Sequence, residues 1–167
     1  VASMSIRDIN EIFEIRTALE SLSNGLAAER ITAEELESLQ RLLVQIGGYV
    51  EEGDMDNIVK TDIEFHDLLY HAARNSRLVG IISNLRDQLT RFRTLSMSYP
   101  GRLETTLEEH REIVEAISEG DVKRAKKAAE RHMEMSEKTL LKAVDAKKKD
   151  SEKKVGKKAR KASKSEE

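Results

Sequence analysis

Apolar residues recur every three or four positions along most of this chain, and this spacing predicts helices. In the first segment, at about 6–30, the pattern runs through Ile9, Ile12, Phe13, Leu19 and Leu26. A helix with 3.6 residues per turn brings such residues to one face, whereas a half-buried strand needs alternation at every second residue. We find no strand pattern of that kind. The spacing therefore predicts an all-α fold.

Five further segments show the same helical spacing, and the breaks between them are short. We expect helices over about 32–52, 54–75, 76–97, 102–118 and 122–143. Thr32 and Glu35 form a capping-box pattern at the start of the second segment, and Gly53 follows its end. Because short connections make neighbouring helices antiparallel, these segments predict an antiparallel helical bundle.

The composition agrees with one helical domain. The chain has 167 residues, of which 36% are charged and only 4% are aromatic. Cysteine is absent, which excludes disulfides and thiolate metal sites. Neither a signal peptide nor a run of about eighteen apolar residues is present, so we expect a cytoplasmic protein with no membrane partner.

The formal net charge of −2 hides an uneven distribution. From residue 142 onward there are eleven Lys and Arg against five Asp and Glu, whereas residues 1–141 hold 18 basic and 26 acidic residues. An acidic body argues against a nucleic-acid surface there, because phosphate binding needs clustered Lys and Arg. Residues 146–167 are rich in Lys and poor in apolar residues. We expect them to form a disordered, solvated tail rather than a specific polyanion-binding element.

Four potential metal ligands lie on the apolar faces of the predicted helices. Asp62 and His66 are four residues apart and share a helix face, while His110 and His132 lie on the apolar stripes of two later helices. His71, five residues after His66, points away from that face and serves as an internal control. Hydrogen-bonded core histidines are the alternative interpretation. Burial of all four groups without partners would be strongly unfavourable, whereas one divalent cation takes up their lone pairs, so we favour a metal site.

The ligand types indicate which metal such a site would hold. Three neutral imidazoles and one carboxylate suit Zn²⁺ best, with Ni²⁺, Mn²⁺ and Fe²⁺ as alternatives. Four protein ligands would leave one or two positions open on a five- or six-coordinate ion. Water or a carboxylate group could occupy them.

Arg16 is a charged residue on the apolar stripe of the first helix, between Phe13 and Leu19. A buried guanidinium needs an anionic partner. One interpretation is an ion pair with Glu20, one helical turn further on. The other is that Arg16 faces the metal site and holds a small carboxylate effector together with the metal.

Two alternatives to a sensing site also fit these residues. A metal-dependent hydrolase would need a general base beside a metal-bound water, for which Glu20 and Glu64 are the available candidates. The chain contains no H-E-x-x-H motif, and Glu64 lies two residues from both Asp62 and His66, so it points away from their face. We therefore do not expect an enzyme. The third interpretation is a purely structural metal with no effector.

Three stretches resemble a known family: EIFEIRTALESLSNGLAAER, DIEFHDLLYHAARNSRLVGII and EEHREIVEAISEGDVKRAKKAAERHM. They are similar to the FCD domain, the C-terminal effector-binding domain of FadR-type regulators in the GntR family, over about residues 6–141. The resemblance implies an antiparallel bundle of six to seven helices. It also implies metal binding by the residues that match the family's ligand pattern, Asp62, His66, His110 and His132. Arg16 matches an arginine that contacts the effector.

The resemblance also implies a domain organisation. Family members carry a winged helix-turn-helix before this domain, and the chain contains no counterpart. We expect residues 1–5 to be a linker remnant, residues 6–145 to be the FCD domain, and residues 146–167 to be the tail. A ligand-sensing domain that forms a homodimer is implied, and operator DNA would be bound only through the absent N-terminal domain.

Overall fold

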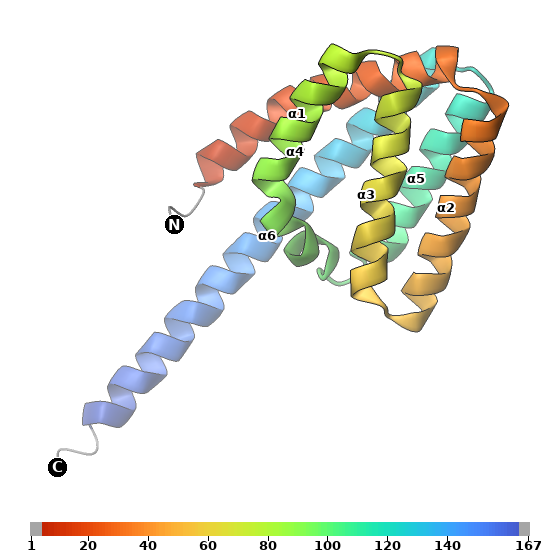
Figure 1. The fold of residues 1–167 in the computed structure, drawn as a ribbon. Helices are drawn as coiled ribbons and strands as arrows, with labels where there is room; N and C mark the ends of the chain where they lie inside the picture. The colour runs from red at the N-terminus through yellow and green to blue at the C-terminus, as the bar shows by residue number, and fades with distance from the viewer. Residues whose placement is uncertain (1–4, 164–167) are drawn as a thin grey trace.

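Six helices joined by short turns form the described part of the chain in a computed structural model (Figure 1). The structure describes residues 5–163, and the side chains of residues 5–149 other than that of Arg91. The helices are α1 (Ile6–Arg30), α2 (Ala33–Glu52), α3 (Met55–Ala72), α4 (Ser76–Met97), α5 (Arg102–Ser118) and α6 (Val122–Ser163). The predicted all-α fold is confirmed.

The helices pack as an antiparallel bundle, and their ends follow the predicted caps. In Figure 1, α2 and α3 lie side by side, and α6 runs back along α1. The capping box of Thr32 and Glu35 is present at the start of α2. Gly53 ends that helix in the left-handed conformation, with a φ of 70° that favours glycine. Local capping therefore determines where α2 begins and where it ends before α3.

The two ends of the predicted domain differ from the sequence expectation. Ser5 caps α1, because its Oγ accepts a hydrogen bond from the Asp8 backbone N–H at 3.1 Å, so it belongs to the helix start rather than to a linker. Residues 1–4 lie outside the described residues.

At the C-terminal end, helical backbone continues to Ser163, beyond the predicted end near Ala143 and through most of the segment expected to be disordered. The abundant Lys and the Ala residues of this segment favour helix, and it contains no proline. Residues 164–167 lie outside the described part.

Three apolar clusters form the core of the described residues, and two of them adjoin the predicted site. The larger joins α1, α2, α3, α5 and α6, and includes Phe65, Leu69 and Ile113. The second joins α1, α4 and α6, and includes Phe13 and Met133. The predicted site residues lie between these clusters, since His110 stacks on Phe65 while Phe13 and Met133 line the cavity described below.

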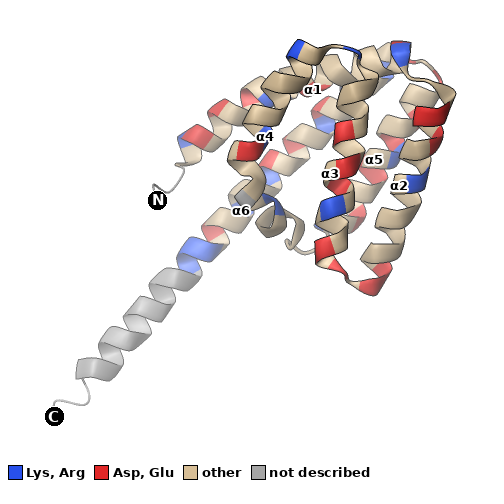
Figure 2. Ribbon diagram, viewed as in Figure 1, with Lys and Arg blue, Asp and Glu red and all other residues tan. Residues whose placement is uncertain are grey.

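The surface charge follows the sequence pattern. Figure 2 shows acidic residues on several helices of the bundle, while a basic segment lies on α6 where this helix leaves the bundle. Among the described residues, no helix is both long enough and apolar enough to cross a membrane.

Candidate metal centre

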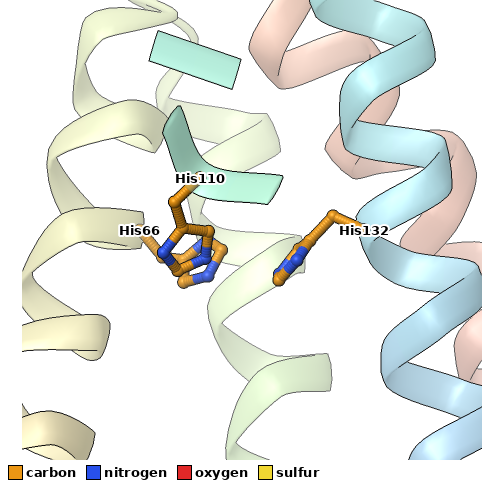
Figure 3. Close-up of side chains that lie close together, drawn as sticks. All are labelled: His66, His110 and His132. Atoms are coloured by element: carbon orange, nitrogen blue, oxygen red, sulfur yellow. The ribbon is translucent and has the colours of Figure 1, made fainter. Parts of the chain in front are cut away.

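Three buried histidines from three helices converge in the interior. His66 belongs to α3, His110 to α5 and His132 to α6, and one ring nitrogen of each lies within 4.8 Å of the others. Figure 3 shows the three rings turned toward one another. His71 is exposed, and its Nδ1 lies 2.7 Å from the Asp67 backbone oxygen. The structure thus brings together the three predicted histidines and leaves the control residue outside.

Three ring nitrogens of the cluster are buried without hydrogen-bond partners among the described residues. Neither ring nitrogen of His110 has a partner, and Nδ1 of His66 has none. Burial is the main cause that lowers the pKa of His66 and of His110 well below the ordinary value, and repulsion within the cluster adds to it. Neutral imidazoles with free lone pairs are the form that binds a divalent cation. The chemistry of this cluster therefore fits a metal ion.

Asp62 lies beside the histidines as the sequence predicted. Its Oδ1 is 3.8 Å from Nε2 of His66 and 3.7 Å from Nε2 of His110. Its Oδ2 accepts a hydrogen bond from Arg93 of α4. One carboxylate oxygen is therefore paired, and the other faces the cluster.

Arg93 is a site residue that the sequence analysis missed. Its side chain is largely buried and forms an ion pair with Asp62, which lies 31 residues away in the chain. Leu89 and Met97, both buried and apolar, lie one turn on either side of Arg93 in α4. This four-residue spacing was a usable signal, because it places a charge on an apolar helix face.

His132 is oriented by a contact with Glu109, a residue that the sequence did not point to. Its Nδ1 lies 2.7 Å from Oε2 of Glu109, whose Oε1 accepts a hydrogen bond from Arg102 at 3.0 Å. Burial raises the pKa of Glu109, but the bonds to His132 and Arg102 outweigh it and lower the pKa overall. An ionised Glu109 places the proton of His132 on Nδ1. Nε2 is then left with the lone pair that a metal needs.

Arg16 is buried and takes part in a network with two other side chains. Its Nη2 donates to Oε1 of Glu20 at 3.0 Å, and the Tyr70 hydroxyl donates to the same oxygen at 2.6 Å. Burial lowers the pKa of Arg16, but Glu20 and Tyr70 outweigh this effect and raise it. The ion pair with Glu20, one of the two interpretations from the sequence, is present. Arg16 Nε has no hydrogen-bond partner among the described residues.

Arg16, His66 and His132 line one cavity of about 60 Å³. The polar and charged residues that line it are Arg16, Asp62, His66, Arg86, Arg93, Ser96, Arg102, Thr106, His132 and Ser136. This volume holds a few water molecules or a small ligand group. Both interpretations of Arg16 are therefore compatible, because the residue is ion-paired and also lines the space beside the histidines.

Known proteins with similar sequences are transcriptional regulators. YdhC of Bacillus subtilis, an HTH-type regulator, is 31% identical over 134 residues, which cover 80% of this chain and 58% of YdhC. LutR of the same organism is 28% identical over 135 residues, covering 78% of this chain and 61% of LutR. The chain thus spans less than two thirds of the length of these relatives.

Solved structures show the same fold. Escherichia coli McbR/YncC superimposes with a TM-score of 0.79 at 24% identity, covering 85% of this chain and 72% of that one. The metal-free FCD domain of TM0439 superimposes with a TM-score of 0.69 at 21% identity, covering 87% of this chain and 99% of that one. Residues 11–135 match the FCD domain family. The chain therefore belongs to the FCD domain family, and its relatives are GntR-family HTH-type transcriptional regulators.

Proposed function

We propose that this FCD domain binds a divalent metal through Asp62, His66, His110 and His132, with Zn²⁺ as the best candidate and Ni²⁺, Mn²⁺ or Fe²⁺ as alternatives. The observation that carries this proposal is the burial of His110 with both ring nitrogens unpartnered, next to two further imidazoles and a carboxylate. A cation at this place would accept the lone pairs of the three imidazoles and offset the negative charge of Asp62.

The second part of the proposal is that the site senses a small carboxylate. The effector would take an open position on the metal and the guanidinium of Arg16, which lines the same cavity as His66 and His132. Contact with helices α1, α3 and α6 would favour one arrangement of the bundle, because a ligand shifts an equilibrium by its differential affinity for two states. The cavity beside the histidines favours an effector over a purely structural metal.

An enzymatic role has less support. Glu20, one of the two candidate bases, is engaged by Arg16 and Tyr70, and Glu64, the other, is exposed. The named relatives are regulators. We therefore propose a non-enzymatic sensor, part of a cytoplasmic homodimeric regulator that contacts operator DNA through a helix-turn-helix domain outside this chain.

Elemental analysis of the purified chain, combined with thermal melting, tests the metal site. We expect near-stoichiometric metal, a melting temperature that falls on chelation, and loss of both properties in the double variant His110→Ala/His132→Ala. His71→Ala is the matched control and should keep the metal. If the wild-type chain remains metal-free after reconstitution with Zn²⁺ and its melting temperature does not change, the histidines are core residues and the proposal fails.

The carboxylate site needs a separate test on the metal-loaded protein. Small organic acids that bind should raise the melting temperature. Arg16→Lys keeps the charge but removes the planar fork that pairs with a carboxylate, so it should weaken binding by about tenfold or more while the metal content is kept. If Arg16→Lys binds the acid as tightly as the wild type does, Arg16 does not contact the effector.

A further inference from the structure

The last part of α6 runs on past the other helices of the bundle (Figure 1) and is strongly basic. Ala143 is the last buried residue of this helix among the described side chains, and residues 145–149 are exposed. Helical backbone nevertheless continues to Ser163. Residues 148–161, which we call the basic extension, hold eight Lys and Arg against two Asp and Glu. Positive charge is therefore concentrated where α6 has passed the end of the bundle core.

The register of the helix gathers most of these basic residues on one half of its circumference. Positions three or four residues apart share a helix face. This spacing gives two adjacent basic rows, which are Lys149, Lys153, Lys157 and Arg160 in one and Lys154, Lys158 and Lys161 in the other. Asp150 is the only acidic residue on this half, and it lies at its start. A rise of 1.5 Å per residue makes this basic face about 18 Å long.

The basic extension lacks the intrahelical charge pairs that occur in the bundle. On α1, for example, Arg7 pairs with Glu11 one turn further on, at 2.7 Å. Lys157, Lys158 and Lys161 have no acidic residue three or four positions away in either direction, and several of those positions are basic. Like charges at this spacing repel and destabilise a helix. An anionic partner would relieve this repulsion.

The opposite half of the extension indicates which kind of anionic partner fits. It contains Val155, Ala159 and Ala162, and residues 148–163 include no Leu, Phe or Trp. A helix that lies on a membrane needs a stripe of such large apolar residues to insert. Protein interfaces are commonly held by large anchors such as Trp or Tyr. The phosphates of DNA require neither, because they bind clustered Lys and Arg electrostatically. Duplex DNA therefore fits the basic face best.

We infer that the basic extension of α6 binds the phosphate backbone of duplex DNA without reading its sequence. Duplex DNA carries one negative charge per about 1.7 Å of its axis, so a face about 18 Å long can lie against several phosphates. Residues 1–141 hold 18 basic and 26 acidic residues, which disfavours DNA elsewhere on this chain. The contact rests on the proposed role in a DNA-binding regulator, but neither on the metal nor on the effector. It would add to the binding by the helix-turn-helix domain outside this chain.

Fluorescence anisotropy of a labelled DNA duplex, titrated with the full chain, tests the inference. We expect binding at low ionic strength that weakens as salt is added, with log K falling by about 0.9 per tenfold increase in salt for each phosphate contacted. A second duplex of unrelated sequence should bind equally well. Absence of binding at low ionic strength would overturn the inference.

Two matched double variants locate the contact. Lys157→Gln/Lys161→Gln removes two charges, one turn apart, from the basic face, so the affinity at low ionic strength should fall by about tenfold and its salt dependence should become shallower. Lys123→Gln/Lys127→Gln removes two charges with the same spacing from exposed positions of α6 within the bundle. This control should keep the affinity and the salt dependence of the wild type. Equal weakening in both variants would show that total charge causes the binding, and would contradict a contact at the basic face.

Two further measurements separate this contact from its alternatives. Vesicles of phosphatidylglycerol and phosphatidylcholine should bind the chain more weakly than DNA does, and tighter binding to the vesicles would overturn DNA in favour of a membrane surface. Addition of EDTA should leave the affinity for DNA unchanged. Loss of DNA binding on chelation would contradict a contact made by the extension alone, whereas absent DNA binding in a chain that retains zinc would leave the metal site standing.

Discussion

Asp62 divides its two carboxylate oxygens between Arg93 and the histidine cluster. Oδ2 accepts a hydrogen bond from Arg93, while Oδ1 lies 3.8 Å from Nε2 of His66 and 3.7 Å from Nε2 of His110. The arginine therefore compensates the buried carboxylate in the absence of a cation. It also holds the second oxygen toward the place where a cation would lie.

Replacement of Arg93 should make the stability of the protein depend more strongly on metal. Arg93→Met leaves Asp62 buried without a partner, so we expect the free energy of unfolding of the metal-free protein to fall by about 3 kcal/mol. Zn²⁺ should restore part of this loss, because the cation then compensates Asp62. Denaturant unfolding with and without zinc measures both effects, and Arg77→Met is the control. A variant that zinc stabilises no more than wild type would show that Asp62 does not face the metal.

His110 should reduce the stability of the metal-free protein. Both of its ring nitrogens are buried without hydrogen-bond partners among the described residues. We expect His110→Leu to raise the free energy of unfolding of the metal-free chain by about 1–2 kcal/mol and to abolish stabilisation by zinc. His71→Leu, at an exposed position, should have little effect on either quantity. Loss of stability in His110→Leu without metal would contradict this prediction and show that the buried imidazole is better accommodated than leucine.

Glu109 should strengthen metal binding without touching the metal. Its carboxylate holds His132 through Nδ1 at 2.7 Å. We expect Glu109→Gln to weaken zinc affinity by about 10- to 100-fold. Glu108→Gln, at the exposed neighbouring position, is the matched control. Competition with a chromogenic chelator measures both affinities, and equal values for the two variants would refute a role for Glu109 in orienting His132.

Glu35 should stabilise the fold in a pH-dependent way. Burial raises its pKa, but the hydrogen bond from the Thr32 backbone and the ion pair with Arg74 outweigh this effect, so the pKa is lowered. A depressed pKa means that the stabilisation is complete above the unfolded-state value and is lost as the pH falls through the folded-state value. Glu35→Gln should therefore cost stability at neutral pH and much less in acid. Unfolding free energies of the variant and wild type across pH give this difference.

Glu51→Gln, at an exposed position near the end of the same helix, provides the comparison for Glu35. Its difference from wild type should stay small at every pH. A Glu35→Gln difference that remained constant down to acid pH would assign the effect to helix propensity rather than to ionisation.

Much of the site could be predicted because the spacing of residues within a single helix is enough to place these polar side chains on its apolar face. The four-residue spacing of Asp62 and His66, and the apolar neighbours of His110, identify buried polar groups without any tertiary information. Glu109 is different, since it is only partly buried and its importance comes from His132 on another helix. Contacts between helices depend on how the helices pack, and the residue spacing within one helix does not reveal them.

The end of α6 was predicted wrongly for a different reason. Periodicity marks where a helix packs against the core, and the apolar pattern does end near Ala143. The helical backbone continues because helix-forming residues need no packing partner to extend a helix that has already begun. The sequence therefore located the boundary of the bundle rather than the boundary of the helix.

The ion pair between Arg16 and Glu20 has a consequence for the speed of recognition. Because Glu20 and Tyr70 already hold the guanidinium, an arriving anion would not have to order a long and flexible side chain. An arginine that is free to rotate loses about 2 kcal/mol of rotamer entropy when it is fixed. Association should therefore be governed by passage into the cavity, and a mutation that loosens Glu20 should slow the capture of the anion even where the final contacts are unchanged.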